Sequence, residues 1–409
     1  GLVMRSQARL EATERAYLSA LEVDGDNPEI LLNYGALLVE FHRFIEAEQC
    51  VRKVLALKPD YINAHIGLGM LLKDQGRMQE SMAALRRAIE IDPQEPSAHS
   101  SLLFVINCIP DMDPYERFAA YQEFNQRFAV PLHKQWRPHT NARSTARRLR
   151  VGYVAAVFRA HACVMFLEPL LAHHDPERVE LFAYAEQYEL EDVVTDRYRT
   201  YFEHWRDTKD ISDEQLADLI RHDQIDVLID IAGHTKGHRL GAFARKPAPV
   251  SLHWLDSGYT TGLTAIDYYL TDAATAPAGC EALFSETPWR LPRTALIYRP
   301  LGYMGEVNAL PALERGYVTF GTLTRAIRLN PRLIETWVRL LQRMPDSHLV
   351  INSHNFSQPE VCELWLQRFE DLGIARERLE IGFQSPVWSV LHGVDIALDC
   401  FPQNSGTTL

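Results

Sequence analysis

The sequence predicts an N-terminal solenoid of paired helices, followed by an α/β portion with two Rossmann-like parallel sheets. Three observations support this fold class. The first hundred residues repeat with a period of 34 residues. From Leu149 onward, short apolar runs alternate with helical segments of about 10–15 residues, and this alternation starts again after Pro300. We therefore predict four parts, namely helical repeats at 1–110, a helical linker at 111–148, a first sheet domain at 149–310 and a second, incomplete sheet domain at 311–409.

The composition is that of a globular protein, and it narrows the possible classes of function. Hydrophobic residues make up 46% of the 409 residues, and charged residues make up 23%. The formal net charge of −12 argues against a nucleic-acid binder, which normally carries a basic face. The apolar runs are too short to span a membrane, and the six scattered cysteines form no CxxC pair. We expect a cytoplasmic protein without a membrane span or a nucleic-acid partner.

Small residues and prolines recur at equivalent places in two consecutive N-terminal segments. The pairs that lie 34 residues apart are Gly35 and Gly69, Leu38 and Leu72, Val54 and Ala88, and Pro59 and Pro93. This pattern resembles the tetratricopeptide repeat, in which each unit is a hairpin of two helices. We expect the glycines to let helices approach closely, and the prolines to end the second helix of each unit. Residues 12–26 are then the second helix of an earlier unit, and another unit begins at Pro96.

An array of such units forms a superhelix whose concave side commonly binds extended peptide. We therefore predict that residues 1–110 hold a protein or peptide partner. The alternative is that the array only packs against the next domain.

The predicted linker begins with a helix start that has two interpretations. Asp111 and Asp113 form a DxD pair, a spacing that many metal-dependent sugar transferases use. They also stand directly before Pro114, where an aspartate commonly caps a helix. We interpret the pair as a helix cap, followed by a helical stretch that reaches Trp136 and a polar, basic segment at 137–148.

Apolar segments in the second half predict the strands of the two sheets. For the first sheet they are 149–157, 179–187, 225–233, 248–256 and 266–272, and for the second sheet 317–323, 347–352, 379–382 and 394–401. Helical patterns lie between them at 164–175, 211–224, 330–344, 359–373 and 385–393. Strands that alternate with helices in this way form parallel sheets covered on both faces.

Ligands of such sheets bind at the carboxyl ends of the strands, so the loops after the strands are the candidate sites. The loop after the first strand carries Arg159 and His161. The imidazole of His161 suits a base or an anion contact, because it titrates near neutrality, although a structural role is the alternative. The loop "AGHTKGHRL" contains Gly233 and Gly237, whose backbone lets a ligand approach closely.

Polar groups in "AGHTKGHRL" also suit phosphate or hydroxyl binding, namely Thr235, Lys236 and the backbone amides. The alternative is a plain strand-to-helix turn. A third Gly/Thr loop follows the strand at 248–256. A fourth, "FGTLTRAIRLNP", carries Arg325 and Arg328, whose guanidinium groups suit a diphosphate. The fifth, "PQNSGTTL", closes the sequence. Five such loops over two sheets predict a cleft that holds a nucleotide sugar.

Longer motifs are more specific than the single loops. The segments "RLRVGYVAAVFRAHACVMFLEPLLAHHD", "FARKPAPVSLHWLDSGYTTG" and "VDIALDCFPQNSGTT" stand after the helical repeats in this order. Together they closely resemble the O-linked N-acetylglucosamine transferases of the TPR/SPINDLY type, which have a GT-B fold. The resemblance runs from the repeats to the last residue.

The resemblance implies an inverting, metal-independent transferase that uses UDP-GlcNAc and no further cofactor. A Ser or Thr hydroxyl of a protein held in the TPR groove attacks the sugar, and UDP leaves. His161 corresponds to the family's motif histidine near the sugar and phosphate, and Gly237 belongs to a sugar-binding loop. Arg328 takes the place of a lysine that contacts the diphosphate. The family's phosphate contacts at the start of a helix correspond to Gly406, Thr407 and Thr408.

Several positions depart from the family pattern and leave other functions open. They are Val157, Asp256, Tyr259, Arg328 and Val387. The family also continues beyond the position of Leu409 with a further helix and strands. One alternative is a divergent protein glycosyltransferase that uses another nucleotide sugar, such as a glucosyl- or fucosyltransferase. The other is a non-catalytic TPR scaffold with a degenerate transferase domain.

Overall fold

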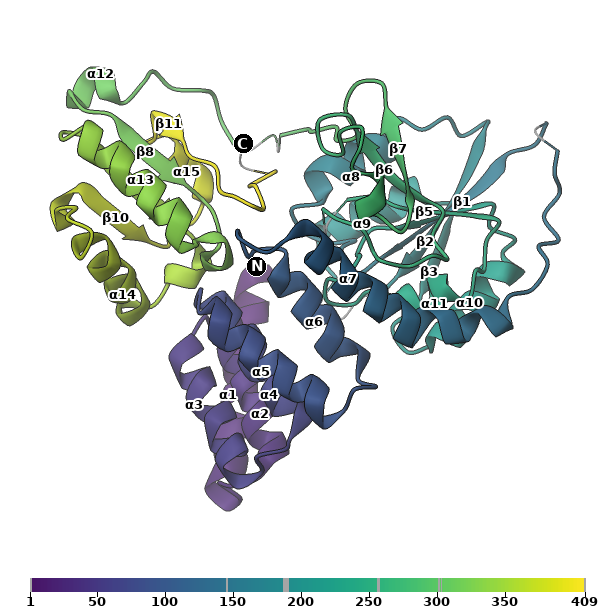
Figure 1. The fold of residues 1–409 in the computed structure, drawn as a ribbon, viewed down its shortest axis with the longest axis horizontal. Coiled ribbons are helices and arrows are strands. Elements are labelled where there is room, and N and C mark those ends of the chain that lie inside the picture. The colour runs from purple at the N-terminus through teal and green to yellow at the C-terminus, as the bar shows by residue number, and fades with distance from the viewer. Residues whose placement is uncertain are drawn as a thin grey trace. The chain divides into compact units, whose positions relative to one another are not determined.

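The computed structural model describes residues 2–144, 146–186, 191–255, 258–300, 302 and 304–407, with side chains from residue 10 onward. The contacts divide the chain into two units (Figure 1). One unit combines Gly1–Asp111 with Met304–Leu409, and the other is Met112–Tyr303. The predicted boundaries of the four parts stay a prediction, because the units follow contacts rather than chain segments.

The N-terminal part of the first unit is an array of helices, as the repeat predicted. Its helices are α1 (Leu2–Val23), α2 (Pro28–Glu40), α3 (Phe44–Leu57), α4 (Ile62–Asp74), α5 (Met78–Ile91) and α6 (Pro96–Ile106). The side chain of Asn27 accepts hydrogen bonds from two amides at the start of α2, and Glu95 caps α6 in a similar way. Pro59 and Pro93 stand just beyond the ends of α3 and α5, where they were expected to stop each second helix.

Equivalent residues of the repeat form the core of the array. The side chains of Leu38, Leu72, Val54 and Ala88 are all buried. The two repeat glycines, however, have different surroundings. A Cβ on Gly69 would lie 2.6 Å from Leu85 Cγ, whereas a Cβ on Gly35 would lie no closer than 3.5 Å to any neighbouring atom. The expected close helix approach is therefore found at Gly69 but not at Gly35.

The second sheet also belongs to the first unit and has four parallel strands (Figure 1). Its strands are β8 (Thr319–Thr322), β9 (His348–Asn352), β10 (Leu379–Gly382) and β11 (Ile396–Ala397), in the order β10-β9-β8-β11. Its α-helices are α12 (Ala312–Arg315), α13 (Pro331–Arg343), α14 (Pro359–Glu370) and α15 (Val387–Leu391), and its short turns are η4 (Ala326–Arg328), η5 (His354–Phe356) and η6 (Arg376–Arg378). The predicted strands and helices of this part are confirmed.

The helical array packs directly against the helices and turns of this sheet. Gly76, in the turn after α4, has a φ of +75°. A Cβ at this position would lie 2.7 Å from Trp365 and 3.0 Å from the carbonyl oxygen of Ala326 in η4. Asp111 forms an ion pair with Arg332 at 2.5 Å. The last turns of the repeat are thus part of the same packed unit as the second sheet.

The second unit opens with α7 (Pro114–Phe124), η1 (Asn125–Ala129) and η2 (Val130–Gln135), and continues into a seven-stranded parallel sheet. The strands are β1 (Leu149–Ala155), β2 (Val179–Ala185), β3 (His204–Asp207), β4 (Val227–Asp230), β5 (Val250–His253), β6 (Tyr268–Asp272) and β7 (Thr287–Leu291), in the order β3-β2-β1-β4-β5-β6-β7. The other helical elements are α8 (Val164–Leu171), α9 (Val193–Tyr201), α10 (Asp213–His222), α11 (Leu240–Ala244) and η3 (Glu281–Leu283).

The elements of this unit that were not predicted include α9, α11, β3 and β7. The side chains of β3 are only half-buried or exposed, and β7 alternates buried Pro288 with exposed neighbours. Both strands lie at the edges of the sheet. Edge strands bury fewer side chains than central strands, so their sequences lack the continuous apolar run that marks a parallel strand.

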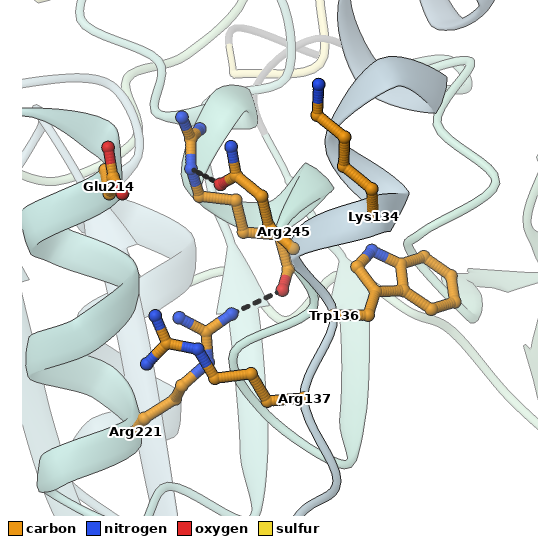
Figure 2. Close-up of a pocket in the computed structure, with 7 residues that line it drawn as sticks. Lys134, Trp136, Arg137, Glu214, Arg221 and Arg245 are labelled. Carbon is orange, nitrogen blue, oxygen red and sulfur yellow. Dashed lines mark hydrogen bonds between the residues drawn. The ribbon is translucent and has the colours of Figure 1, made fainter.

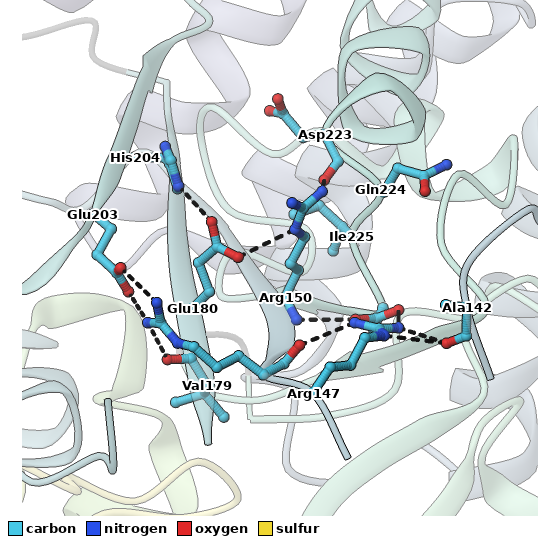
Figure 3. Close-up of polar contacts among 12 residues, drawn as sticks. Ala142, Arg147, Arg150, Val179, Glu180, Glu203, His204, Asp223, Gln224 and Ile225 are labelled. Atoms are coloured by element: carbon cyan, nitrogen blue, oxygen red, sulfur yellow. Dashed lines mark hydrogen bonds and ion pairs between the residues drawn. The ribbon is translucent and has the colours of Figure 1, made fainter. Parts of the chain in front are cut away.

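A network of charged residues ties the amino-terminal ends of neighbouring strands together (Figure 3). Glu180, at the start of β2, pairs with Arg150 at 3.2 Å and with His204 at 2.7 Å. Arg147 pairs with Asp226 at 2.6 Å, just before β4. Burial opposes ionisation of Asp226, but hydrogen bonds from Arg147 and from the Arg150 amide hold the pKa of Asp226 below its usual value. These charges stabilise the amino-terminal ends of the strands. The candidate site is formed by the loops at the carboxyl ends of the strands.

Candidate functional site

Four of the five candidate loops lie at two points where the order of the strands in a sheet reverses. In the first sheet β1 leads to β2 and β3 on one side, whereas its other neighbour is β4. In the second sheet β8 leads to β9 and β10 on one side, and β11 pairs with its other side. Ligands of open parallel sheets bind beyond the carboxyl ends of the strands at such switch points. The loops after β1 and β4 flank one, and those after β8 and β11 flank the other.

In the loop after β1, His161 is held by its own backbone surroundings. Its Nδ1 accepts a hydrogen bond from the Cys163 amide at 3.3 Å, just before α8. The Ala160 amide donates to Asp192 Oδ2 at 2.8 Å, and Asp192 also caps α9. Because Nδ1 is an acceptor here, the neutral imidazole of His161 carries its proton on Nε2. This side chain therefore presents an N–H donor rather than a basic nitrogen at Nε2.

The loop after β4 starts from a buried aspartate–histidine contact. Asp230, which is fully buried, contacts His253 Nδ1 at 2.7 Å and accepts a hydrogen bond from the Gly233 amide at 2.9 Å. Burial opposes the charge on Asp230, but these hydrogen bonds hold the pKa of this carboxyl below its usual value. The pair joins β4 to β5 and fixes the first turn of the loop.

The rest of this loop contains two buried side chains with polar partners, and a more accessible stretch at Lys236 and Gly237. His234 is buried and lies 2.8 Å from the Thr261 carbonyl oxygen, and burial lowers the pKa of His234 to about 3. Arg239 is also buried and pairs with Asp213 at 2.5 Å and with Glu186. Gly237 lies at the tip with a φ of +82°, a backbone geometry that favours glycine. Gly237 is half-buried, and the neighbouring Lys236 is exposed.

The third candidate loop, after β5, uses its polar groups internally. The hydroxyls of Thr260 and Thr261 both donate to the buried carboxylate of Glu286. Gly262 has a φ of +78°, and a Cβ there would lie 2.6 Å from the Tyr121 carbonyl oxygen in α7. These contacts give the threonines and this glycine structural roles. Asp256, one of the departures from the family pattern, lies outside the described residues.

The fourth and fifth loops, after β8 and β11, are joined by hydrogen bonds. The Asn330 amide group donates to the Phe401 carbonyl oxygen at 2.6 Å, and Thr324 lies 3.2 Å from Cys400 Sγ. Arg328 Nη1 donates to Ser405 Oγ at 3.5 Å. Arg328 and the end of the chain, predicted separately as phosphate contacts, are thus brought together.

The predicted phosphate contacts at the end of the chain are only partly described. Gly406 is exposed and Thr407 is half-buried, and both follow Ser405 directly. Ser405 is held by its amide, which donates to Asp399 Oδ1 at 2.8 Å. Thr408 lies outside the described residues.

Two pockets of about 260 Å³ each lie away from the switch points. The pocket in Figure 2 is lined by Lys134, Gln135, Trp136, Arg137, Glu214, Arg221 and Arg245. Its arginines hold the segment after η2 to α10 and α11. Arg137 and Arg221 both contact Asp218 Oδ1, at 3.0 and 2.8 Å, and Arg245 Nε donates to Gln135 at 2.9 Å. The other pocket lies at the starts of β8, β9 and β10, the edge opposite the loops.

The structure also tests the DxD pair and reveals residues that the sequence did not single out. Asp113 accepts hydrogen bonds from two amides of α7, so its interpretation as a helix cap is confirmed. The buried partners His253 and Glu286 were missed. A polar residue within an apolar strand is a signal for such a group, but the sequence does not identify its partner.

Two further features are absent from the described residues. No cluster of three or more His, Cys, Asp or Glu side chains in this part of the chain is arranged to hold a metal ion. None of the described helices is long and apolar enough to cross a membrane.

Comparisons with known proteins agree with helical repeats followed by a glycosyltransferase domain. A family model described as "Tetratricopeptide repeat" matches residues 38–103, and "Glycosyl transferase family 41" matches residues 116–299. The structure of a mutant O-GlcNAc transferase from Thermobaculum terrenum is similar over 97% of this chain and 76% of that chain. It has a TM-score of 0.91 and 32% sequence identity.

Curated relatives from plants are similar over most of this chain. "Probable UDP-N-acetylglucosamine--peptide N-acetylglucosaminyltransferase SPINDLY" from Solanum lycopersicum is 31% identical over 78% of this chain and 35% of its own length. The protein of the same name from Arabidopsis thaliana is also 31% identical, over 78% of this chain and 36% of its own length. The chain therefore spans about a third of the length of these relatives.

Proposed function

The chain belongs to glycosyl transferase family 41, and on this premise we propose that it acts in the transfer of N-acetylglucosamine from UDP-N-acetylglucosamine to Ser or Thr hydroxyls of proteins. The names of the similar proteins support this donor and a peptide acceptor. In the proposed reaction the acceptor hydroxyl oxygen bonds to the anomeric carbon with inversion, and the bond from that carbon to the diphosphate oxygen breaks. UDP leaves, and the hydroxyl proton is released to solvent.

The observation that carries the proposal is the cationic site at the second switch point. Arg328 lies there beside Ser405, and Gly406 and Thr407 follow in the same loop. A departing UDP develops negative charge, which fixed cations and hydrogen-bond donors stabilise in the transition state. Arg328 supplies this charge from the protein, so the proposed reaction uses no metal. We assign Gly406, Thr407 and Thr408 to phosphate contacts in the same proposal.

His161 and Gly237 act on the sugar and phosphate in this proposal. With Nδ1 occupied by the Cys163 amide, His161 offers an Nε2–H donor to an oxygen of the donor substrate. This protonation favours a role in binding and charge stabilisation over the role of general base. Gly237, half-buried in the loop after β4, lets the backbone approach the sugar.

In this proposal the helical array binds the acceptor protein. Repeats of this type bind extended peptide along their concave surface. The end of the array also contacts the loop after β11, because Cys108 Sγ donates a hydrogen bond to Gln403 Oε1 at 3.2 Å. A protein acceptor on the array would thus be bound by the same packed unit that holds the leaving group.

The test measures nucleotide binding first and transfer second. We expect calorimetry to detect UDP binding, and mass spectrometry to detect one N-acetylhexosamine on a Ser/Thr peptide after incubation with UDP-N-acetylglucosamine. Parallel incubations with UDP-glucose and GDP-fucose test the divergent-transferase alternative. Binding without transfer from any of these donors would contradict the proposed transfer, and no UDP binding would favour the scaffold alternative.

Two variants of His161 test its role as a donor. His161→Ala should lower transfer by about 10- to 100-fold, whereas His161→Gln, which can still donate a hydrogen bond, should retain more transfer. UDP affinity should change far less than transfer in both variants. Equal loss in the two variants would contradict the donor role, and unchanged transfer in His161→Ala would exclude any role in the reaction.

A further inference from the structure

The pocket shown in Figure 2 carries more positive than negative charge, and we call it the basic pocket. It has a volume of about 260 Å³ and lies in the second unit, between η2, the segment after η2, α10 and the end of α11. Its charged lining residues are Lys134, Arg137, Glu214, Arg221 and Arg245. None of these residues belongs to the loops after β1, β4, β8 or β11, so the proposed function leaves the basic pocket unexplained.

One carboxylate compensates two of the cations in the basic pocket. Arg137 and Arg221 both contact Asp218 Oδ1, at 3.0 and 2.8 Å. Arg221 also donates to the Arg245 carbonyl oxygen at 2.6 Å, and its buried Nε has no hydrogen-bond partner among the described residues. A single negative charge thus serves two guanidinium groups, which leaves about one positive charge uncompensated.

The other two cations have no acidic partner within the described part of the chain. Arg245 donates from Nε to Gln135 Oε1 at 2.9 Å and from Nη1 to the Gly241 carbonyl oxygen at 2.7 Å, so both acceptors are neutral. Lys134 is exposed at the pocket, and its ammonium group forms no hydrogen bond or ion pair with a described residue. The carboxylate of Glu214 also lines the pocket but forms no ion pair with either cation in this part of the chain.

The charge balance indicates which class of ligand the basic pocket suits. Its four cations face the carboxylates of Glu214 and Asp218, which leaves about two positive charges. A phosphate monoester carries about −1.5 to −2 charges near pH 7 and offers three acceptor oxygens. A carboxylate carries one negative charge and offers two oxygens. Guanidinium groups bind phosphate through a fork of N–H donors, and a lysine adds a point charge. A phosphate monoester therefore matches both the charge and the donors.

Trp136 adds a flat apolar wall to the basic pocket. Its Nε1 donates to the Ala244 carbonyl oxygen at 2.8 Å, and its ring packs against His133 with ring centroids 4.4 Å apart. These contacts hold the indole in place while 42% of the residue stays exposed. An exposed aromatic face suits the carbon part of an organic phosphate. The volume of about 260 Å³ is below the range of about 300–1,000 Å³ for drug-sized ligands, which favours a small monoester.

From this arrangement we infer that the basic pocket binds a small phosphate monoester. Lys134 and Arg245 contact the phosphoryl group, Arg137 and Arg221 add positive charge, and Trp136 packs against the organic part. The inference goes beyond the proposed function, because none of these residues belongs to the proposed donor site. The phosphoryl group can come from a free metabolite or from a phosphorylated side chain, and the test distinguishes the two sources.

Calorimetry with glycerol 3-phosphate tests the basic pocket, with UDP present to fill the proposed donor site. We expect the wild type to bind with a Kd of about 1 mM or below, and Lys134→Gln to weaken binding by about five- to tenfold. Because Lys134 has no partner among the described residues, its replacement should leave the melting temperature unchanged. Arg245→Gln should weaken binding by more than about tenfold. The matched control is Lys209→Gln, which removes an exposed lysine of the same unit outside the pocket and should leave the affinity unchanged.

Two further ligands define the chemistry that the basic pocket recognises. Glycerate, which has a carboxylate in place of the phosphoryl group, should bind at least about fivefold more weakly than glycerol 3-phosphate. A short peptide with one phosphoserine identifies the source of the phosphoryl group. Tighter binding than that of glycerol 3-phosphate assigns the pocket to a phosphorylated side chain, and weaker binding assigns it to a free metabolite. Both results support the site.

Three outcomes would overturn the inference. They are no binding of glycerol 3-phosphate at about 10 mM, wild-type affinity in both Lys134→Gln and Arg245→Gln, and equal affinity for glycerate. Because the variants locate the site, these outcomes do not depend on UDP. The inference fails alone if the wild type binds UDP but not glycerol 3-phosphate, and it stands alone if the reverse is found.

Discussion

Several buried charged residues of the second unit are paired with a group of opposite charge or with a hydrogen-bond partner. Asp230 is paired with His253, and Arg239 is paired with Asp213 and Glu186. His234 differs, because it is buried against aromatic rings and stays neutral, with a pKa lowered to about 3. A buried neutral histidine makes folding sensitive to acid, since the unfolded chain takes up a proton that the folded chain resists.

The pH dependence of His234→Gln tests this assignment. The pKa of His234 is about 3 in the folded state, against about 6.5 for an unperturbed histidine. Its contribution to stability is therefore complete above the unfolded pKa and is lost as the pH falls below it, by about 1.4 kcal/mol per pH unit. Between pH 7 and 5 the wild type should lose roughly 2 kcal/mol more stability than the variant. Urea unfolding at both pH values measures this difference.

The control for this experiment is His222→Gln, which replaces an exposed histidine at the end of α10 in the same unit. It should keep the pH dependence of the wild type. His238 contributes in the same direction as His234, because burial lowers its pKa too. The His234 variant should therefore reduce the acid sensitivity without abolishing it, and an unchanged pH dependence would contradict the assignment.

At the scale of elements, the repeat shows that equivalent sequence positions do not have equivalent packing. Gly35 in α2 and Gly69 in α4 are 34 residues apart. Leu85 of α5 is fully buried directly against Gly69, at a distance that leaves no room for a methyl group. The neighbours of Gly35 leave ordinary van der Waals space. The repeat pattern therefore predicts where the helices are, but not which pair touches most closely.

Alanine at these two positions should change stability in opposite directions. Gly35→Ala should raise the free energy of unfolding by up to about 1 kcal/mol, because alanine favours the helix. Gly69→Ala should lower it by about 1–2 kcal/mol, since displacing the packed Leu85 outweighs the helix preference. Chemical denaturation of both variants checks the signs. Two stabilising substitutions would show that Leu85 moves freely.

At the scale of the whole molecule, the first unit joins segments far apart in the sequence. The turn after α4 packs on η4, the turn that carries Arg328, and on Trp365 of α14. The helical repeats and the second sheet are therefore not independent modules. A change in the repeat at Gly76 is expected to reach the proposed phosphate site directly.

Gly76→Ala tests this connection. The substitution is strained by the positive φ of +75° and by a clash with Trp365 and the Ala326 carbonyl oxygen. It should lower the free energy of unfolding by about 2 kcal/mol and weaken UDP binding at the same time. Gly67→Ala is the matched control, because Gly67 lies in α4 with nothing within 4 Å of its Cβ position. If Gly76→Ala lost stability but bound UDP like the wild type, the repeat and the site would be uncoupled.

Most of the fold was predictable, because periodicity is a local property of the chain. The helices of the repeat, the central strands and the Asp113 cap were all read from nearby residues. The edge strands β3 and β7 and the helix α9 were missed, since their burial depends on neighbours rather than on their own apolar runs. Of the proposed site, the loops were predicted as separate segments. That Thr260 and Thr261 are used by Glu286 was not predictable, because the two segments are 25 residues apart in the sequence.

The sequence by itself determined the order of the helical and sheet parts and the family, because these depend on repeat spacing and on contiguous motifs. Only the tertiary structure decided which loops meet. It joined Arg328 to Ser405 across 77 positions and left Arg325 without a partner in the described part of the chain. The reason is physical: strand order determines which carboxyl ends are neighbours, and a charge is compensated by what lies near it in space. Neither can be read from a local stretch of sequence.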